Sequence, residues 1–227
     1  MGQSNDDRLD AGGRVRHVVW DWNGTLFDDH VAVVAAVNDA LAVLGLGPID
    51  SQIYRSRYTR PVQRFYEQLA GRRIGSGEWQ ALDDAYHGSY RARLERLALA
   101  PDAWTALASA EAAGLTQSLL SMWRHQDLLA LAERLGIGRF FLRVDGLRVP
   151  GGGGKTEHLA AHLAALKVDA AAVLLVGDAL DDLAAAWAVG AHCVLYDGGS
   201  HHRHALEATG VPVVDTLTAA LAVAKHM

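Results

Sequence analysis

Short apolar runs alternate along most of the chain with longer segments whose apolar residues recur at helical spacing. The clearest strand patterns are residues 17–20 and 171–176, which are apolar, contain valine, and each end just before an aspartate-bearing turn. Similar runs lie at 115–120, 140–144, 192–195 and 211–214. Strands that alternate with helices favour right-handed crossovers and a mostly parallel sheet covered on both faces. The pattern therefore predicts a three-layer, Rossmann-like α/β core.

Residues 28–100 interrupt this alternation, because their pattern is helical throughout. Apolar residues recur at helical spacing over 33–44, and a long amphipathic stretch covers 79–97. No buried-strand pattern occurs between them, so we expect an all-helical cap domain inserted into the core. The predicted organisation is a disordered tail at 1–14, an α/β core at 15–27 and 101–227, and a helical cap at 28–100.

Composition and charge narrow the class of protein. Half of the 227 residues are hydrophobic, and the net charge of -5 argues against nucleic acid or an anionic membrane as a partner. No run approaches the roughly 20 apolar residues of a membrane span. Cys193 is the single cysteine, which excludes an intrachain disulfide and favours a reducing cytoplasm. We expect a cytoplasmic protein, either a monomer or a homodimer.

Polar residues directly follow three of the predicted strands: Asp21, Ser121 and Asp178. In open α/β sheets, ligands bind beyond the carboxyl ends of the strands, so these side chains are expected to meet at one edge. Asp178, Asp181 and Asp182 would repel one another unless a cation or hydrogen bonds offset their charge, and carboxylate oxygens suit Mg²⁺. Helix capping is the alternative interpretation of these aspartates.

Lys155 follows a run of four glycines, 151–154. A lysine at the start of a helix can neutralise a carboxylate or a phosphate. The glycine run lacks the spacing of a Walker motif and does not follow a clear strand, which argues against a nucleotide-binding loop.

The order of these four features resembles the haloacid dehalogenase superfamily of aspartate-nucleophile hydrolases. The similarity is to phosphoglycolate-phosphatase-like members, whose helical cap is inserted after the first strand. It extends to residues 34–38, 60–67 and 176–191. The resemblance implies a Mg²⁺-dependent phosphatase that acts on a small phosphorylated metabolite through an aspartyl-phosphate.

The resemblance also implies a role for each matching residue. Asp21 would be the nucleophile and a metal ligand. The backbone carbonyl of Asn23 and the carboxylates of Asp178 and Asp182 would complete the Mg²⁺ site. Ser121 would hold the transferring phosphoryl group.

Lys155 would pair with the nucleophile and the phosphate, which removes the repulsion between a carboxylate and a phosphate dianion. On the substrate side, the basic and aromatic stretch 54–64 could bind the remainder of the substrate or form a solvated helix face. We expect Arg60, Met122 and Arg124 to contact substrate, although the family often has asparagine where Met122 stands.

Asn23 departs from the family, whose phosphatases usually carry a second, acid–base aspartate at this position. General acid–base catalysis is typically worth ~10²–10⁴-fold, so the loss matters. Three explanations remain open at this point: a good leaving group such as an acyl or aryl phosphate, a proton from His30, His125 or a cap residue, or a weakly active or non-catalytic phosphate-binding protein. A related hydrolase such as a dehalogenase is a further alternative.

Overall fold

A six-stranded parallel sheet forms the centre of the computed structural model, which describes residues 14–149 and 153–225. The strands are β1 (His17–Trp20), β2 (Thr116–Arg124), β3 (Arg143–Leu147), β4 (Val173–Gly177), β5 (His192–Tyr196) and β6 (Val213–Val214). Their spatial order is β3-β2-β1-β4-β5-β6, and every neighbouring pair is parallel. Apart from Arg14, the tail predicted at 1–14 lies outside the described residues.

The central strands are buried on both faces, as their continuous apolar sequence requires. Every residue of β1 and β4 is buried. Successive side chains of a strand point to opposite faces, so Val18 and Trp20 join one hydrophobic cluster and Val19 joins the other. The three-layer α/β core predicted from the sequence is confirmed.

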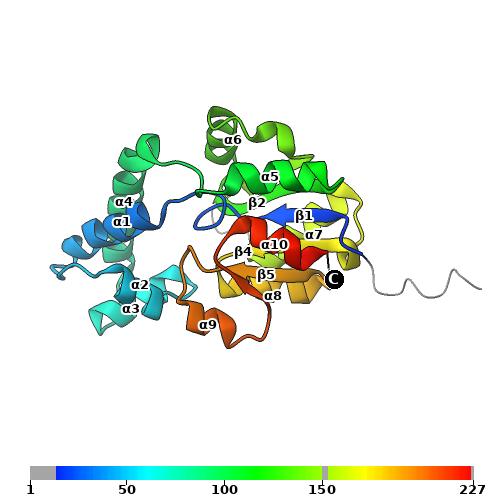
Figure 1. Ribbon diagram of the computed structural model, residues 1–227. Coiled ribbons are helices and arrows are strands. Elements are labelled where there is room, and N and C mark those ends of the chain that lie inside the picture. The colour runs from blue at the N-terminus through cyan, green and yellow to red at the C-terminus, as the bar shows by residue number, and fades with distance from the viewer. Residues whose placement is uncertain (1–13, 150–152, 226–227) are drawn as a thin grey trace, which may run out of the picture.

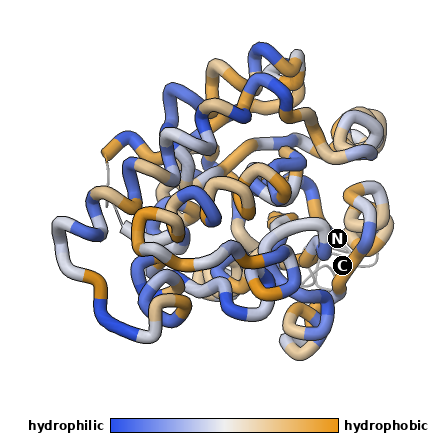
Figure 2. Tube along the Cα trace, turned by 90° about the vertical axis from the view of Figure 1, so that its left-hand side faces the viewer, coloured by the Kyte–Doolittle hydropathy of each residue, from blue (hydrophilic) through white to orange (hydrophobic). Residues whose placement is uncertain are grey.

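Helices cover both faces of the sheet (Figure 1). The first cluster contains residues of α5 (Ala103–Ala112), α6 (His125–Arg134) and α10 (Leu217–Ala224). The second contains residues of α7 (Lys155–Leu166), α8 (Leu180–Val189) and α9 (Arg203–Glu207). Orange and blue segments alternate along the helices in Figure 2, as expected where one side of a helix packs on a core. Across 14–149 and 153–225, every helix is too short or too polar to span a bilayer.

The chain between β1 and α5 is helical and has a hydrophobic cluster of its own. It forms α1 (His30–Val43), α2 (Ser51–Arg57), α3 (Val62–Ala70), α4 (Ser76–Arg93) and a 3₁₀ turn (Leu94–Arg96). Its cluster includes Leu41, Phe65 and Leu82, and α1 packs along α4 (Figure 1). The two connections to the sheet lie together, since Asp28 N donates to Ala98 O at 3.0 Å. We call this helical segment the cap; that it is a separate domain stays a prediction.

The predicted and observed strand bounds differ most at β2 and β3. β2 continues through Ser121 to Arg124, and its pairing with β3 shifts register between Leu120 and Arg124. Phe140, expected in a strand, lies in a 3₁₀ turn because its ring packs edge-on against Trp104 at 5.3 Å, and β3 begins only at Arg143. Neither difference moves the strand ends that carry Asp21 and Asp178.

Candidate active site

A pocket of about 220 Å³ lies between the carboxyl edge of the sheet and the cap. Its lining includes all six residues predicted for catalysis or metal binding, together with two of the predicted substrate contacts: Asp21, Asn23, Ser121, Lys155, Asp178, Asp182, Arg60 and Met122. Parallel strands bring their carboxyl ends to one edge, which is why residues more than 150 positions apart meet here. The structure thus brings these residues together, although their individual roles stay predictions.

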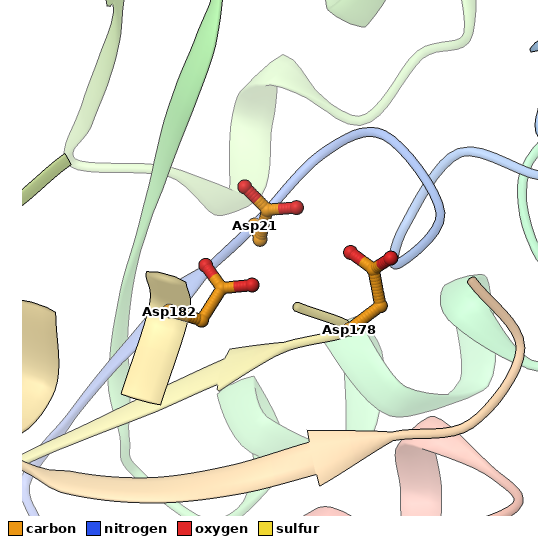
Figure 3. A group of neighbouring side chains, drawn as sticks. All are labelled: Asp21, Asp178 and Asp182. Atoms are coloured by element: carbon orange, nitrogen blue, oxygen red, sulfur yellow. The ribbon is translucent and has the colours of Figure 1, made fainter. Parts of the chain in front are cut away.

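Three carboxylates converge at the floor of the pocket. Asp21 follows β1, Asp178 follows β4, and Asp182 lies in the first turn of α8. One oxygen from each lies within 4.8 Å of the others, and the three side chains gather in one region from separate segments of the chain (Figure 3). All three are buried, Asp182 completely. This is a set of hard oxygen donors of the kind that binds Mg²⁺.

Lys155 is the cation of the floor. It begins α7 and is itself buried, and its Nζ forms ion pairs with Oδ1 of Asp21 and Oδ1 of Asp182. Burial acts to lower the pKa of Lys155, but Asp182 and Asp21 outweigh it and raise that pKa. The lysine therefore stays charged and holds the nucleophile candidate in place.

The negative charge of the floor exceeds what one ammonium offsets. Burial raises the pKa of Asp21 to about 6, although Lys155 acts in the opposite direction. Burial also raises the pKa of Asp178, as does the neighbouring Asp182, and burial raises that of Asp182 itself. A divalent cation would relieve this repulsion, so the donor set fits Mg²⁺ both in chemistry and in charge.

Asp178 is oriented by two loops, the turn that follows β1 and the loop that contains Gly199 and Ser200. Its Oδ2 accepts from Ser200 N at 2.6 Å, and its Oδ1 accepts from Thr25 Oγ1 at 3.3 Å. A Cβ at Gly199 would lie 2.0 Å from Asp178 Oδ2, and one at Gly24, where φ is +72°, would lie 2.7 Å away. Both positions therefore require glycine, because the backbone approaches the carboxylate closely.

Asn23 belongs to a hydrogen-bonded network that the sequence did not predict. Its Nδ2 donates to Asp29 Oδ2 at 2.7 Å and to Tyr90 Oη at 2.9 Å. Tyr90 Oη donates in turn to Asp29 Oδ2 at 2.5 Å, and Gly24 N donates to Asp29 Oδ1 at 2.9 Å. Asp29 precedes α1 at the N-cap position, but its side chain turns to these donors and not to the helix.

The remaining oxygen of Asn23 faces Ser121. Ser121 Oγ lies 3.5 Å from Asn23 Oδ1 and accepts from Trp123 N at 3.1 Å. Burial raises the pKa of Asp29, while the hydrogen bonds from Tyr90 and Asn23 oppose that shift. No sequence motif marks Tyr90, since it reaches the core only because α4 packs over the pocket.

The predicted substrate contacts separate into two groups. Arg60 lines the pocket and pairs through Nε with Oδ2 of Asp181 at 3.1 Å, and Met122 lines it as well. Arg124 is not among the lining residues, because it ends β2 with its side chain exposed beside Asp127 of α6, at 3.5 Å. The structure does not bring Arg124 to the pocket.

The two histidines considered as proton donors also differ. His30 lines the pocket, and burial lowers its pKa to about 4, with Arg55 contributing. His125 is absent from the lining, and its Nδ1 accepts from Gly146 N at 3.2 Å. His30 is therefore a neutral imidazole near pH 7 and is not protonated to act as a general acid.

A family model of haloacid dehalogenase-like hydrolases matches residues 15–190. The chain belongs to this family. Among curated relatives of this haloacid dehalogenase-like hydrolase are two phosphoglycolate phosphatases. One, from Pseudomonas fluorescens, is 26% identical over 223 residues, 94% of this chain and 81% of the relative. The other, from Synechococcus elongatus, is 28% identical over 194 residues, 84% of this chain and 88% of the relative.

Solved structures share the fold. A haloacid dehalogenase-like hydrolase from Streptococcus pneumoniae superposes with a TM-score of 0.79 at 16% identity, covering 92% of this chain and 98% of the other. One from Bacteroides fragilis gives 0.75 at 18% identity, with coverage of 90% and 99%. The family, fold class and hydrolase class predicted from the sequence are confirmed; the cytoplasmic location and the oligomeric state stay predictions.

Proposed function

We propose that this hydrolase is a Mg²⁺-dependent phosphatase that transfers the phosphoryl group of a small phosphorylated metabolite to Asp21. One observation carries the proposal: a buried carboxylate at a strand end is held by Lys155 and shares a pocket floor with Asp178 and Asp182. The names of the curated relatives support a phosphate ester as the substrate class.

The chain's own residues account for most of the chemistry. A carboxylate oxygen of Asp21 attacks phosphorus, the bond from phosphorus to the leaving oxygen breaks, and an aspartyl-phosphate forms. Lys155 reduces the repulsion between the attacking carboxylate and the phosphate, and Ser121 can donate to an equatorial oxygen. Water then attacks the same phosphorus and releases phosphate, and Asp21 is restored.

Asp21 and Asp178 are the proposed carboxylate ligands of Mg²⁺, with the backbone oxygen of Asn23 and, directly or through water, Asp182. When bound, the ion supplies positive charge that offsets the phosphoryl oxygens. The excess of carboxylates over ammonium groups on the pocket floor supports this assignment.

The test combines phosphate release with metal binding. We expect Asp21→Asn to lower phosphate release with Mg²⁺ by on the order of 10⁴-fold or more, as for loss of other enzymic nucleophiles. Asp178→Asn should abolish Mg²⁺ binding measured by calorimetry. Asp169→Asn is the matched control, since Asp169 precedes β4 at the opposite edge of the sheet and its side chain accepts from Ala171 N, away from the pocket.

Each other outcome identifies an alternative. Equal activity in wild type and Asp21→Asn would contradict the nucleophile assignment. Phosphate binding without release would favour the non-catalytic phosphate-binding alternative. Halide release from haloacids, unaffected by chelation of Mg²⁺, would favour a dehalogenase.

A further inference from the structure

Residue 23 cannot deliver a proton to a leaving group. Asparagine has no titratable proton, and both hydrogens of its Nδ2 are used by Asp29 and Tyr90, at 2.7 and 2.9 Å. The amide is therefore fixed with its oxygen toward Ser121. What the amide offers on the pocket side is a hydrogen-bond acceptor, which gives no help to a departing alkoxide.

The neighbouring carboxylate does not replace that proton. Asp29 is 1% exposed, and its two oxygens accept from three donors: Gly24 N, Asn23 Nδ2 and Tyr90 Oη. All three contacts are donated to the carboxylate, so Asp29 acts as an acceptor here and directs no proton toward a leaving group. A substrate whose leaving group needs protonation is poorly served here.

The cations of the pocket are also committed. Among the described residues that line it, the lysine and arginine side chains are Lys155 and Arg60. Lys155 pairs with Asp21 and Asp182 on the floor, and Arg60 pairs with Asp181. A second anionic group on the substrate, such as a carboxylate, would have to displace one of these pairs.

The upper walls of the pocket are aromatic. Tyr58, Tyr86, Tyr90 and Trp123 line it, with Tyr86 stacked on Tyr90 at a centroid distance of 6.0 Å and an interplanar angle of 10°. Trp123 meets Tyr90 edge-on at 6.2 Å. These rings come mainly from the cap, whereas the acids come from the core, so the substrate's phosphate and its remainder meet different surfaces.

A second cavity lies on the other side of these rings. It has a volume of about 120 Å³ and shares five lining residues with the pocket: Val33, Tyr54, Tyr58, Tyr86 and His87. It is smaller than an apolar cavity of about 150 Å³ that binds benzene, and Asp83 and His87 also line it, so it adds space beside the rings and is not by itself a ring site.

We propose that the substrate is an aryl phosphate, whose ring lies among the cap tyrosines and whose phenolate leaves without a proton from residue 23. The inference rests on the proposed phosphatase function. Asp21 forms a bond to phosphorus, and the bond from phosphorus to the aryl oxygen breaks with its electron pair on that oxygen. The phenolate delocalises the charge into its ring and takes a proton from solvent. Water then attacks the aspartyl-phosphate, the Asp21 carboxylate departs with its electron pair, and the proton of the water passes to solvent.

The first test is a leaving-group series on the wild-type protein with Mg²⁺. The probes are 4-nitrophenyl phosphate, phenyl phosphate, acetyl phosphate, 2-phosphoglycolate and ethyl phosphate. We expect kcat/KM for 4-nitrophenyl phosphate to exceed that for ethyl phosphate by ~10²–10⁴-fold, the worth of a missing general acid. Acetyl phosphate has a good leaving group but no ring, so its kcat/KM should be lower than that of 4-nitrophenyl phosphate by ~10-fold or more.

The second test separates the ring site from the leaving group. Tyr86→Ala should lower kcat/KM for 4-nitrophenyl phosphate by ~10-fold more than it lowers kcat/KM for acetyl phosphate, while Tyr86→Phe, which keeps the ring, should lose less than Tyr86→Ala. Calorimetry on Asp21→Asn measures binding without turnover, and should give tighter binding of 4-nitrophenyl phosphate than of 2-phosphoglycolate. A circular-dichroism melt establishes that each variant is folded.

The outcomes distinguish this inference from the function on which it rests. If ethyl phosphate or 2-phosphoglycolate is hydrolysed as well as 4-nitrophenyl phosphate, and Asp21→Asn abolishes that activity, the aryl assignment is wrong and the phosphatase stands. If kcat/KM for acetyl phosphate equals that for the aryl esters, the proposed binding site for a ring is wrong. If none of the probes gives phosphate release that depends on Asp21, the proposed function itself fails.

Discussion

The elements β1, β2 and α7 carry a buried polar cluster at each of their two ends, and the two clusters differ in charge. At the amino end of the strands, His17 Nε2 and His162 Nε2 each lie 2.8 Å from Ser118 Oγ. The other ring nitrogen of each histidine ends the chain of contacts. His17 Nδ1 lies 2.8 Å from Thr116 Oγ1, and His162 Nδ1 lies 2.8 Å from Asp145 Oδ2. At the carboxyl end the same three elements present Asp21, Ser121 and Lys155.

The histidine cluster satisfies itself. Thr116 Oγ1 lies 2.8 Å from His17 Nδ1 and 3.2 Å from Arg16 O, and we assign its proton to the shorter contact. With both imidazoles neutral, His17 then donates to Ser118, Ser118 to His162, and His162 to Asp145, so that each contact has one proton. Burial lowers the pKa of His17 to about 4, with His162 contributing, and burial lowers that of His162 as well. This cluster needs no ligand.

The carboxylate cluster does not satisfy itself, because Asp21, Asp178 and Asp182 share one ammonium, that of Lys155. Burying charge costs free energy unless it is paired, so the excess favours binding of a cation. The comparison teaches that burial of polar groups alone does not mark a functional site. Charge that the chain leaves unbalanced is the better indicator.

The largest effect is expected from removing the ammonium. Lys155→Met should lower phosphate release by ~10³-fold, as for loss of other groups that stabilise charge in a transition state. It should also lower the free energy of unfolding in urea by ~3–5 kcal/mol, because Asp182 is left buried and unpaired. The control is Lys167→Met at the exposed end of the same helix. Activity within tenfold of wild type would show that the carboxylates do not depend on this cation.

The next effect concerns the neutral amide within the charged cluster. Asn23→Asp should raise kcat/KM for ethyl phosphate by ~10²-fold, since it supplies a general acid. The new carboxyl group would face Asp29, and the repulsion between two adjacent carboxylates favours a state in which one of them is protonated. The double variant Asn23→Asp/Asp29→Asn exchanges the two side chains, so the amide can donate to the new carboxyl, and should be the more stable of the two. A fall in activity in both variants would show that Asn23 has a role of its own.

Mg²⁺ should stabilise the protein through the carboxylate cluster alone. At about 100 times its Kd, the ion adds ~2.7 kcal/mol to the free energy of unfolding. Thermal melts with and without Mg²⁺ measure this as a rise of ~5–10 °C in Tm. Asp178→Asn should remove this rise. His162→Gln should lower Tm in the absence of Mg²⁺ but should still show the rise when Mg²⁺ is added. A rise that survives Asp178→Asn would place the ion elsewhere.

The sequence predicts the floor of the site well because strand ends are marked locally. Asp21 and Asp178 each follow an apolar run, and parallel strands must bring such ends to one edge. The remainder depends on contacts between segments that no local pattern relates. Tyr90 reaches Asn23 only through the packing of α4 over the sheet, 67 positions along the chain.

The same limit explains the errors at individual residues. Arg124 was expected at the pocket because it lies close to Ser121 in sequence. However, β2 continues past Ser121, and the side chain of Arg124 lies beside Asp127. Asp29 occupies the N-cap position of α1, where a carboxylate commonly caps the helix, but its carboxylate turns to Asn23 and Gly24. A position can be predicted from spacing, whereas the direction of a side chain depends on its partners.

The smallest effect is a pH dependence at the histidine cluster. His17 faces Thr116, Ser118 and His162, and its folded pKa of about 4 lies below the value of an exposed histidine. In that window the unfolded chain binds a proton that the folded protein does not, so stability falls as pH decreases from about 6.5 to about 4. Buried acids such as Asp21 act in the opposite direction, which makes a difference measurement necessary. His17→Gln keeps a donor and an acceptor but cannot titrate, so its free energy of unfolding in urea should fall by ~2 kcal/mol less than that of wild type over this window. Equal losses in the two proteins would mean that His17 is protonated in the folded state, and the cluster at the amino end would not be neutral.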